Sequence, residues 1–366
     1  NTIRINLSGL SKTAFMLSGG MDSASLISIY KHVFNEKPPA VSISYRENIR
    51  ANEINLIEPL AREFASEWNN IIPNRKEFIS EIETIYKKYD HPWVTATVYA
   101  QERLFRGSAD VGYDTLVSGA GGDYHMLGNY PHYLYYFASL KKNGFNDLLD
   151  HEISNWIVNH SVEPWIKTEK TVKEFFDKCI DFNENGKLKI NKQMLVPGVN
   201  ILSEDYKKYH LYLKPLESYG DYTRSYLVKE LYRSASPPAV WSENIMSWLY
   251  NIKEISPYWT KELFEYTWKI PHCFKIKDGM NKIMMRNITN NIVPDHIRLR
   301  KAKTGFSMPF DIWTHDRVFK EMLHDVLDSK RFKERGVYDL KKIKYILKQH
   351  YSEETNHGMQ LWQIIN

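Results

Sequence analysis

Cysteines and long apolar segments are both scarce in this sequence. The two cysteines, Cys179 and Cys273, lie far apart within the 366 residues. Two isolated thiols argue against a disulfide framework or a zinc site, suit a cytoplasmic protein, and are expected to be buried. Since no run of about 18 uncharged apolar residues occurs, we expect no transmembrane helix and no membrane partner.

The sequence also lacks a strong excess of either charge. Lysine and arginine number 49 against 44 acidic residues, which gives a net charge of +5. This excess helps to attract an anionic nucleotide, but it is far below that of nucleic-acid-binding proteins, so nucleic acid is not an expected partner. The composition, 43% hydrophobic and 25% charged, is typical of a globular protein.

Two further features are missing at the first residues. The stretch NTIRINLSGLSK has neither an initiator Met nor an apolar signal core. We therefore expect the sequence to be part of a longer protein, with room for an additional domain before residue 1.

The first third of the sequence alternates strand-like and helix-like patterns. Strands are expected at 13–17, 40–45 and 114–119, and helices at 23–34, 51–68 and 95–110. This alternation predicts an α/β fold with a parallel sheet and helices on both faces, whose ligands bind beyond the carboxyl ends of the strands. Beyond residue 140 the strand signal fades. We predict an α/β core at 1–140 and a helical half at 141–366, which form two domains or one continuous domain.

The stretch LSGGMDS, residues 17–23, joins a predicted strand to a predicted helix. Glycines allow the backbone to approach a ligand closely, and the N–H groups of such a loop and of the helix N-terminus face an anion. Ser18 and Ser23 add hydroxyl donors. Asp22 would repel a phosphate unless a cation lay between them, which implies Mg²⁺. The alternative is an ordinary strand–helix turn capped by Asp22.

This loop lacks the lysine of a Walker P-loop and instead resembles the SGGxDS loop of the ATP pyrophosphatases, or PP-loop enzymes. Those enzymes cleave ATP between the α and β phosphates, and their loop holds the pyrophosphate portion. The resemblance implies the PP-loop type of α/β fold for this chain and ATP as its nucleotide. It assigns the pyrophosphate contacts to Ser18, Gly19, Gly20, Asp22 and Ser23.

A second segment, VSGAGGDYHMLGNY at 117–130, is similar to SGEGADELFGGY of the asparagine synthetase branch of that family. By this resemblance Asp123 joins Asp22 in binding Mg²⁺, and two carboxylates are ordinary ligands of this ion. The adenine and ribose contacts fall by position on Leu17, Ser18, Ile43, Ser118 and Gly119.

A third segment, 255–310, follows the family pattern with a Lys-x-x-x-Arg helix at Lys282 and Arg286 and with the stretch RKAKTGF. Lys303 in that stretch occupies the position of the family lysine that contacts the polyphosphate and stabilises charge in the transition state. Taken alone, a lysine in a basic run is a solvated surface residue. The order of the three segments, which together resemble the family over almost the whole chain, supports the functional assignment.

The chain departs from the family at the residues that handle the amine. Ala120 replaces a Glu that handles ammonia in asparagine synthetases, and the Glu used by β-lactam synthetases aligns with Lys253. A methyl group cannot accept a proton, so a base must come from elsewhere. The candidates are Tyr124, His125, Lys253 and Glu254, and His125 also suits a structural role.

The resemblance implies an ATP- and Mg²⁺-dependent carbon–nitrogen ligase. Such an enzyme adenylates a carboxylate, releases pyrophosphate, and joins the acyl group to an amine or ammonia with AMP as product. The altered amine half favours a specialised relative, such as a lasso-peptide cyclase or a tailoring amidotransferase of antibiotic biosynthesis. Its substrate would be a small molecule or peptide that carries a carboxylate and an amine.

Three other hypotheses stay open. One is asparagine synthetase proper, with ammonia supplied by a glutaminase or another delivery domain or subunit, since residue 1 is not the Cys of a glutaminase. Another is a non-catalytic nucleotide-binding subunit, which Ala120 and Lys253 favour but Asp22, Asp123 and Lys303 oppose. The third is an RNA-modifying PP-loop enzyme, against which the small net charge argues.

Overall fold

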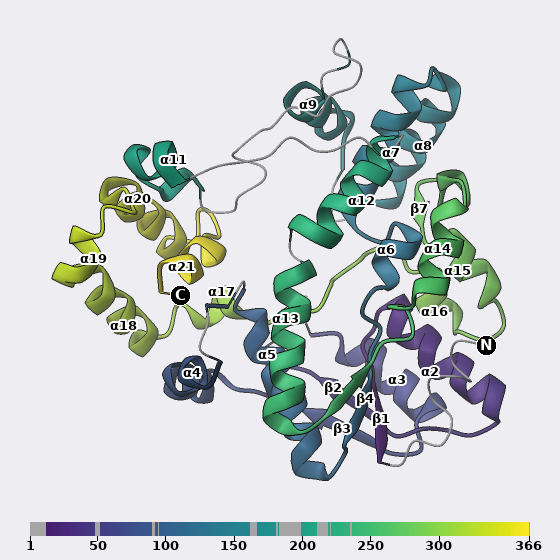
Figure 1. Cartoon of the computed structure of the whole chain (residues 1–366), viewed down its shortest axis with the longest axis horizontal. Coiled ribbons are helices and arrows are strands. Elements are labelled where there is room, and N and C mark those ends of the chain that lie inside the picture. The colour runs from purple at the N-terminus through teal and green to yellow at the C-terminus, as the bar shows by residue number, and fades with distance from the viewer. Residues whose placement is uncertain are drawn as a thin grey trace.

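The structure is a computed structural model that describes residues 12–47, 52–89, 92–93, 95–161, 167–180, 182, 199–210, 219, 221–234 and 236–365. An α/β unit with a central sheet lies on one side of the molecule, and helices from later in the chain extend away from it (Figure 1). No helix within these ranges is both long and apolar enough to span a membrane.

In the described part of the chain, five parallel strands form the central sheet in the order β3-β2-β1-β4-β5. They are β1 (Thr13–Met16), β2 (Ala40–Ile43), β3 (Trp68–Ile71), β4 (Thr115–Val117) and β5 (Lys253–Ile255). The predicted α/β fold with a parallel sheet is therefore confirmed. Strands β1, β2 and β4 lie within the three strands that the sequence predicts.

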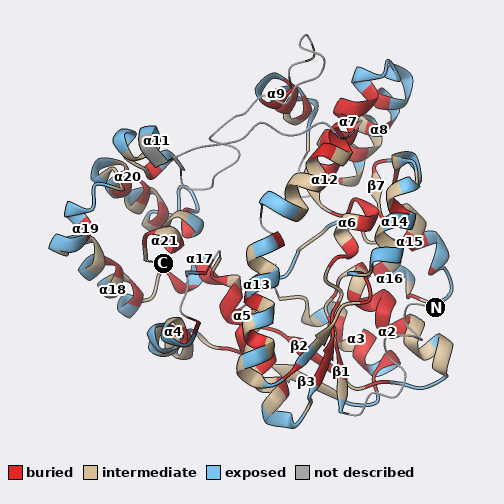
Figure 2. Ribbon diagram, in the orientation of Figure 1, coloured by how far each residue is buried: buried red, intermediate tan, exposed pale blue. Residues whose placement is uncertain are grey.

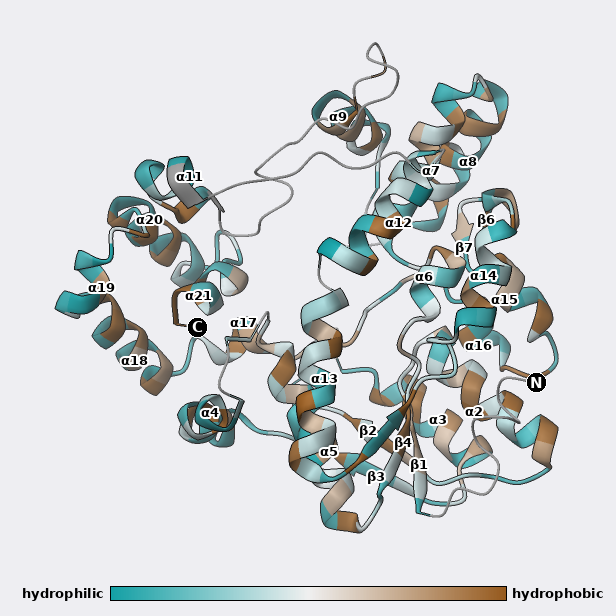
Figure 3. Cartoon of the chain, in the orientation of Figure 1, coloured by the Kyte–Doolittle hydropathy of each residue, from teal (hydrophilic) through white to brown (hydrophobic). Residues whose placement is uncertain are grey.

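Helices cover both faces of the sheet because successive strand residues point to opposite sides. Ala14 and Leu116 pack into the hydrophobic cluster of one face, and Phe15 and Val117 pack into that of the other. These four residues are buried. The central strands as a whole are largely buried (Figure 2) and contain hydrophobic residues (Figure 3). The first face is covered by α5 (Thr97–Val111) and α13 (Ser236–Tyr250), and the second by α2 (Met21–Phe34) and α3 (Ile54–Phe64).

The two outer strands escaped prediction. The helix expected over 51–68 ends at Phe64, and Trp68 already begins β3. Strand β3 reads WNNI and β5 reads KEI, so neither shows the apolar run or the alternation that marks a strand. Both owe their conformation to backbone pairing with an apolar neighbour, as where Glu254 lies opposite Leu116 of β4.

The later part of the chain is mostly helical, but it also completes the sheet. Strand β5 belongs to the predicted segment 141–366, so the sheet takes strands from both predicted segments. The other described elements are α4 (Arg75–Tyr89), α6 (Gly122–Met126), α7 (Tyr130–Lys142), α8 (Asn146–Asn159), α9 (Glu169–Cys179), η1 (Val199–Ile201), α11 (Glu204–His210), α12 (Tyr222–Arg233), α14 (Lys261–Lys269), η2 (His272–Phe274), β6 (Ile276–Lys277), β7 (Met280–Asn281), α15 (Ile283–Ile288), α16 (Asp295–Arg298), α17 (Phe310–Trp313), α18 (Arg317–Asp328), α19 (Lys330–Glu334), α20 (Leu340–Tyr351) and α21 (Gly358–Ile365).

The two thiols lie in different environments. Cys179 at the end of α9 is buried, whereas Cys273 in η2 is exposed. The prediction of two buried thiols is therefore wrong for Cys273. The reason is local, because η2 is a single short turn at the surface in which Phe274 is exposed as well.

Candidate functional site

The two glycine-rich loops leave the sheet side by side. Strands β1 and β4 are hydrogen-bonded neighbours, so the loops that follow them emerge at the same edge. Gly122 at the start of α6 lies against Asp22, and a Cβ on Gly122 would be 2.4 Å from Asp22 Oδ1. A residue without a side chain is required there, and it lets the second loop approach the first.

A cavity of about 320 Å³ opens at this edge of the sheet. The predicted site residues that line it are Leu17, Ser18, Gly19, Gly20, Asp22, Ser23, Ile43, Ser118, Gly119, Asp123, Glu254 and Lys303. Among the described residues that form its wall, Tyr124 and Lys253 do not occur. The structure thus brings both glycine loops and the distant Lys303 to one cavity.

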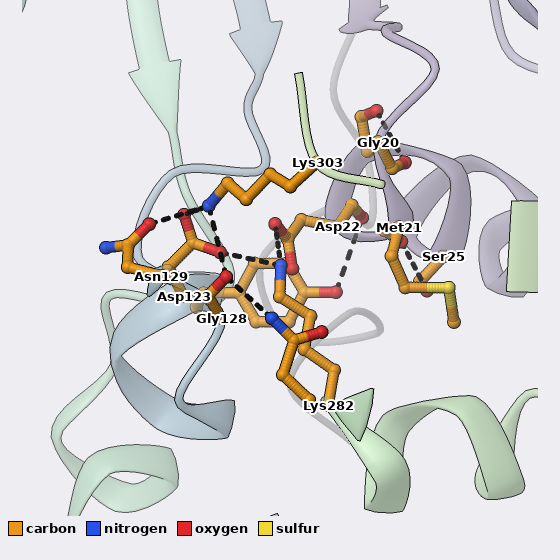
Figure 4. Close-up of polar contacts among 12 residues, drawn as sticks. Gly20, Met21, Asp22, Ser25, Asp123, Gly128, Asn129, Lys282 and Lys303 are labelled. Atoms are coloured by element: carbon orange, nitrogen blue, oxygen red, sulfur yellow. Dashed lines mark hydrogen bonds and ion pairs between the residues drawn. The ribbon is translucent and has the colours of Figure 1, made fainter. Parts of the chain in front are cut away.

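The charged centre of the cavity is a chain of ion pairs (Figure 4). Lys282 Nζ lies 2.5 Å from Asp22 Oδ2 and 2.7 Å from Asp123 Oδ1. Lys303 Nζ pairs with the other oxygen of Asp123 and donates to Asn129 Oδ1 at 2.7 Å. Positive and negative side chains from distant parts of the sequence therefore alternate along this chain of contacts.

Burial makes these charges depend on one another. Lys282 is 4% exposed. Burial disfavours its charge, but Asp123 and Asp22 outweigh this effect and raise the pKa of Lys282. Burial also disfavours the charge of Asp123, yet the ammonium groups of Lys282 and Lys303 hold the pKa of Asp123 below its usual value. Lys282 and Asp123 therefore stay ionised near neutral pH.

The loop after β1 is held by its own serines and by a glutamate. The hydroxyl oxygens of Ser18 and Ser23 are 2.9 Å apart, and Gly20 N–H donates to Ser18 Oγ at 3.2 Å. Gly19 N–H donates to Glu53 Oε2 at 3.0 Å. A loop N–H of the kind that binds phosphate is thus already directed at an anionic oxygen.

Arg300 fixes the position of this glutamate. Its Nη1 donates to Glu53 Oε1 at 2.7 Å and to Gly19 O at 3.1 Å. Its Nη2 donates to Thr304 Oγ1 at 2.6 Å. Arg300 and Lys303 belong to the basic stretch 298–303, and both line the cavity. This part of the stretch is therefore not simply a solvated surface.

The two aspartates suit a divalent cation. Asp22 Oδ1 is buried and has no hydrogen-bond partner among the described residues. Carboxylate oxygens are the donors that Mg²⁺ prefers in proteins. Asp22 and Asp123 therefore fit the ion that their sequence pattern implies, and Lys282 between them supplies a positive charge for the same carboxylates.

Of the predicted amine-handling residues, Glu254 alone faces the cavity in the described structure. Lys253 is exposed on the other side of β5, since adjacent residues of a strand point in opposite directions. Ala120 lines the cavity, and its carbonyl accepts a hydrogen bond from Ser256 Oγ at 2.5 Å. The position that carries an acid in the family is thus held close to the end of β5.

The other two candidates are engaged elsewhere. The Tyr124 hydroxyl hydrogen-bonds to Ser236 Oγ at the start of α13. His125 is buried, with Nδ1 2.8 Å from Thr267 Oγ1 and Nε2 2.5 Å from the carbonyl oxygen of Tyr258. Burial lowers the pKa of His125. These contacts suit the structural role that the sequence offers for His125 as an alternative.

Two functional candidates were missed from the sequence. The sequence places Lys282 in the Lys-x-x-x-Arg pattern of the family but assigns it no role. That match to the pattern is the feature from which a role could have been predicted. Glu243 on α13 lines the cavity together with Glu254, and Gln101 Nε2 donates to Glu243 Oε1 at 3.3 Å. No motif surrounds Glu243, because its position depends on how α13 packs beside β5.

Comparison with known proteins agrees with the resemblance seen in the sequence. The asparagine synthase family model matches residues 2–366. The chain is 20% identical over 355 residues to Asparagine synthetase (glutamine-hydrolyzing) 1 of Bacillus subtilis (strain 168), a match that covers 95% of this chain and 54% of the relative. The chain thus spans about half the length of the curated relative it matches.

Proposed function

Because the chain belongs to the asparagine synthase family, we propose that it is an ATP- and Mg²⁺-dependent ligase that forms an amide bond through an acyl-adenylate. A substrate carboxylate attacks the α-phosphate of ATP, pyrophosphate leaves, and an amine or ammonia then displaces AMP. The substrate is a small molecule or peptide of a specialised biosynthetic pathway.

One observation carries this proposal. Asp22 and Asp123 converge on Lys282, with Lys303 beside Asp123, inside a cavity bounded by a glycine loop. Ion pairs that only stabilise a fold have no need to line a cavity next to loop N–H groups. Fixed cations at that place stabilise the negative charge that develops on a departing pyrophosphate.

Each element of the site has a defined task in the reaction. Ser18, Ser23 and the N-terminus of α2 donate hydrogen bonds to the pyrophosphate portion of ATP. Lys303 supplies positive charge as the bond between the α and β phosphates breaks. Asp22 and Asp123 would hold Mg²⁺, which screens the charge of the polyphosphate when it is bound.

The specialised acceptor is supported by the amine half of the site. Ala120 offers no acid, and Lys253 is exposed away from the cavity. Asparagine synthetase proper, which would receive ammonia from a glutaminase in another part of a longer protein, is the second candidate. The family match and the alignment of 95% of this chain with the Bacillus relative favour it.

Product analysis tests the reaction class. The protein is incubated with Mg²⁺ and ATP in the presence of aspartate with ammonium, or of peptides with a free N-terminal amine and an acidic side chain. We expect AMP and pyrophosphate, with the peptides favoured over aspartate. Formation of ADP would overturn the mechanism, asparagine would identify the second candidate, and nucleotide binding without pyrophosphate exchange would identify a non-catalytic subunit.

The variant Lys303→Ala tests the role of this lysine. It removes one electrostatic contact, so we expect pyrophosphate exchange to fall by about 10²–10³-fold while the thermal unfolding profile stays close to that of the unaltered protein. Undiminished exchange would remove Lys303 from the catalytic site.

A further inference from the structure

Two carboxyl groups of the cavity have no task in the adenylation step. Glu254 comes from β5, and Glu243 comes from α13, the helix that precedes this strand and packs against it (Figure 1). Both are half-buried. Among the described residues, no lysine or arginine contributes to the electrostatic environment of either carboxyl. Negative charge on this pair is therefore not neutralised by a lysine or arginine among these residues.

Hydrogen bonds hold β5, and with it Glu254, beside the loop where the family carries its acid. Ser118 N–H donates to the carbonyl of Ile255 at 2.9 Å, and Ser256 Oγ donates to the carbonyl of Ala120 at 2.5 Å. Lys253 and Ile255, on either side of Glu254, both pair with β4. The methyl group of Ala120 leaves room there for a group presented from β5.

The two carboxyl groups share their environment. Burial, followed by the charge of Glu254, raises the pKa of Glu243 to about 8. Burial also raises the pKa of Glu254, but the neighbouring Ser118 hydroxyl acts in the opposite direction. Gln101 Nε2 donates to Glu243 Oε1 at 3.3 Å. The carboxyl group of Glu243 therefore keeps its proton near neutral pH, which reduces its repulsion with Glu254.

Extending the proposed function, we propose that Glu243 and Glu254 form the subsite for the incoming amine, which enters as a primary ammonium group. Glu254 is the catalytic carboxylate, and Glu243 is a positioning residue that keeps its own proton. After the ammonium has lost one proton to solvent, its nitrogen bonds to the acyl carbon. The bond between that carbon and the AMP oxygen breaks, AMP takes the electron pair, and Glu254 takes the second proton from nitrogen.

By this assignment, one part of the cavity binds anions and another part binds a cation. Lys282, Lys303 and Arg300 serve the anionic phosphates, while the glutamate pair serves a cation. An amine nucleophile is protonated in water at neutral pH, so the site must attract a cation and later accept the second proton, which the nitrogen loses once it has bonded to the acyl carbon. The pair can do both with the same oxygen, which the neutral side chain at position 120 cannot.

Binding of methylammonium tests the subsite without knowledge of the substrate and without ATP. We would follow line broadening of ¹³C-methylammonium by NMR at neutral pH, with tetramethylammonium as a probe of equal charge that has no N–H donor. We expect methylammonium to bind the unaltered protein, and Glu254→Gln to weaken this binding at least about tenfold. Glu243→Gln, a neutral mimic of a protonated carboxyl, should keep it within about threefold. Glu53→Gln removes one charge from the same cavity and should leave binding unchanged.

Infrared spectroscopy tests the separate role of Glu243. The difference spectrum between the unaltered protein and Glu243→Gln should contain a protonated carboxylic acid band at neutral pH, which a merely structural carboxylate would not give. The proposal is overturned if Glu254→Gln binds methylammonium normally, if tetramethylammonium binds equally well, or if Glu53→Gln has the same effect as Glu254→Gln. Pyrophosphate exchange tests the proposed function separately from the subsite. A protein that shows no exchange but binds methylammonium through Glu254 would contradict the proposed function and leave the subsite standing.

A pair that instead binds the ribose hydroxyls of ATP would behave differently. In that case Glu254→Gln would weaken ATP binding and leave methylammonium unaffected, and the proposal would fall. We expect ATP binding by Glu254→Gln to stay within about twofold of the unaltered protein, because the proposed role of the pair begins after adenylation.

Discussion

The ammonium group of Lys282 lies between two carboxylates, 2.5 Å from Asp22 Oδ2 and 2.7 Å from Asp123 Oδ1. The backbone of Lys282 has a φ of 56°, in the left-handed region that a lysine adopts at a cost of about 1 kcal/mol. Such a conformation persists where the surroundings determine it. Here the buried ion pairs provide that constraint, and they join the loop after β1 to the start of α6.

Replacing Lys282 by Met should destabilise the protein by about 3–5 kcal/mol, because it leaves the buried Asp22 without its cation and Asp123 with Lys303 alone. MgCl₂ should restore part of this loss, since an ion that binds the same carboxylates in the folded state compensates for the missing charge. Urea unfolding of the variant, with and without MgCl₂, measures both effects. The exposed Lys277 of the neighbouring hairpin is the matched control, and Lys277→Met should change stability by less than about 0.5 kcal/mol. An equal response of Lys282→Met and the unaltered protein to MgCl₂ would contradict a shared cation site.

The close approach of the two loops predicts the effect of a single methyl group. A Cβ at Gly122 would lie 2.4 Å from Asp22 Oδ1, so Gly122→Ala should cost about 1–3 kcal/mol of stability and displace Asp22 from Lys282. Urea unfolding and pyrophosphate exchange should both report the change. In Gly358→Ala the nearest atom, Asn356 Oδ1, is 3.2 Å away, and this control should keep full exchange. Normal exchange by Gly122→Ala would show that the loops can separate without loss of function.

Local patterns in the sequence predicted the central strands and both glycine loops, because these elements depend on short runs of residues. The edge strands and Glu243 were not predictable in this way, and Glu254 was a candidate only through its place beside a family position. Strand β5 has the sequence KEI, and its extended form depends on pairing with β4. Glu243 lies in the middle of a helix, and it is its packing against β5 that brings it to the cavity beside Glu254. Contacts between residues that pack across elements leave no mark in either local sequence.

The contact between Glu53 and the loop after β1 predicts a competition with phosphate. Gly19 N–H and Arg300 both bond to the Glu53 carboxylate, so a bound polyphosphate has to displace an anion from them. Glu53→Gln should therefore bind pyrophosphate more tightly, by on the order of 1 kcal/mol, in a calorimetric titration. Glu58→Gln removes the same charge from a partly exposed position of α3 and should have no effect. Weaker binding by Glu53→Gln would mean that Glu53 positions Arg300 for phosphate instead of competing with it.

The buried lysine of the turn after η2 predicts a dependence of stability on pH. Lys275 is 2% exposed, and burial, aided by the charge of Arg224, lowers its pKa from 10.5 to about 8. Between these two values the unfolded chain binds more protons than the folded protein, so the contribution of Lys275 to stability rises with pH from about 8 to 10.5. At pH 7 the protonated lysine costs up to about 3 kcal/mol. Lys275→Met should thus exceed the unaltered protein in stability at neutral pH, and this difference should shrink as the pH approaches 10. Urea unfolding of both proteins across this range measures the difference directly, and ionisation of the tyrosines, which both proteins share, cancels from it. A difference that stays constant with pH would show that Lys275 keeps its proton in the folded protein.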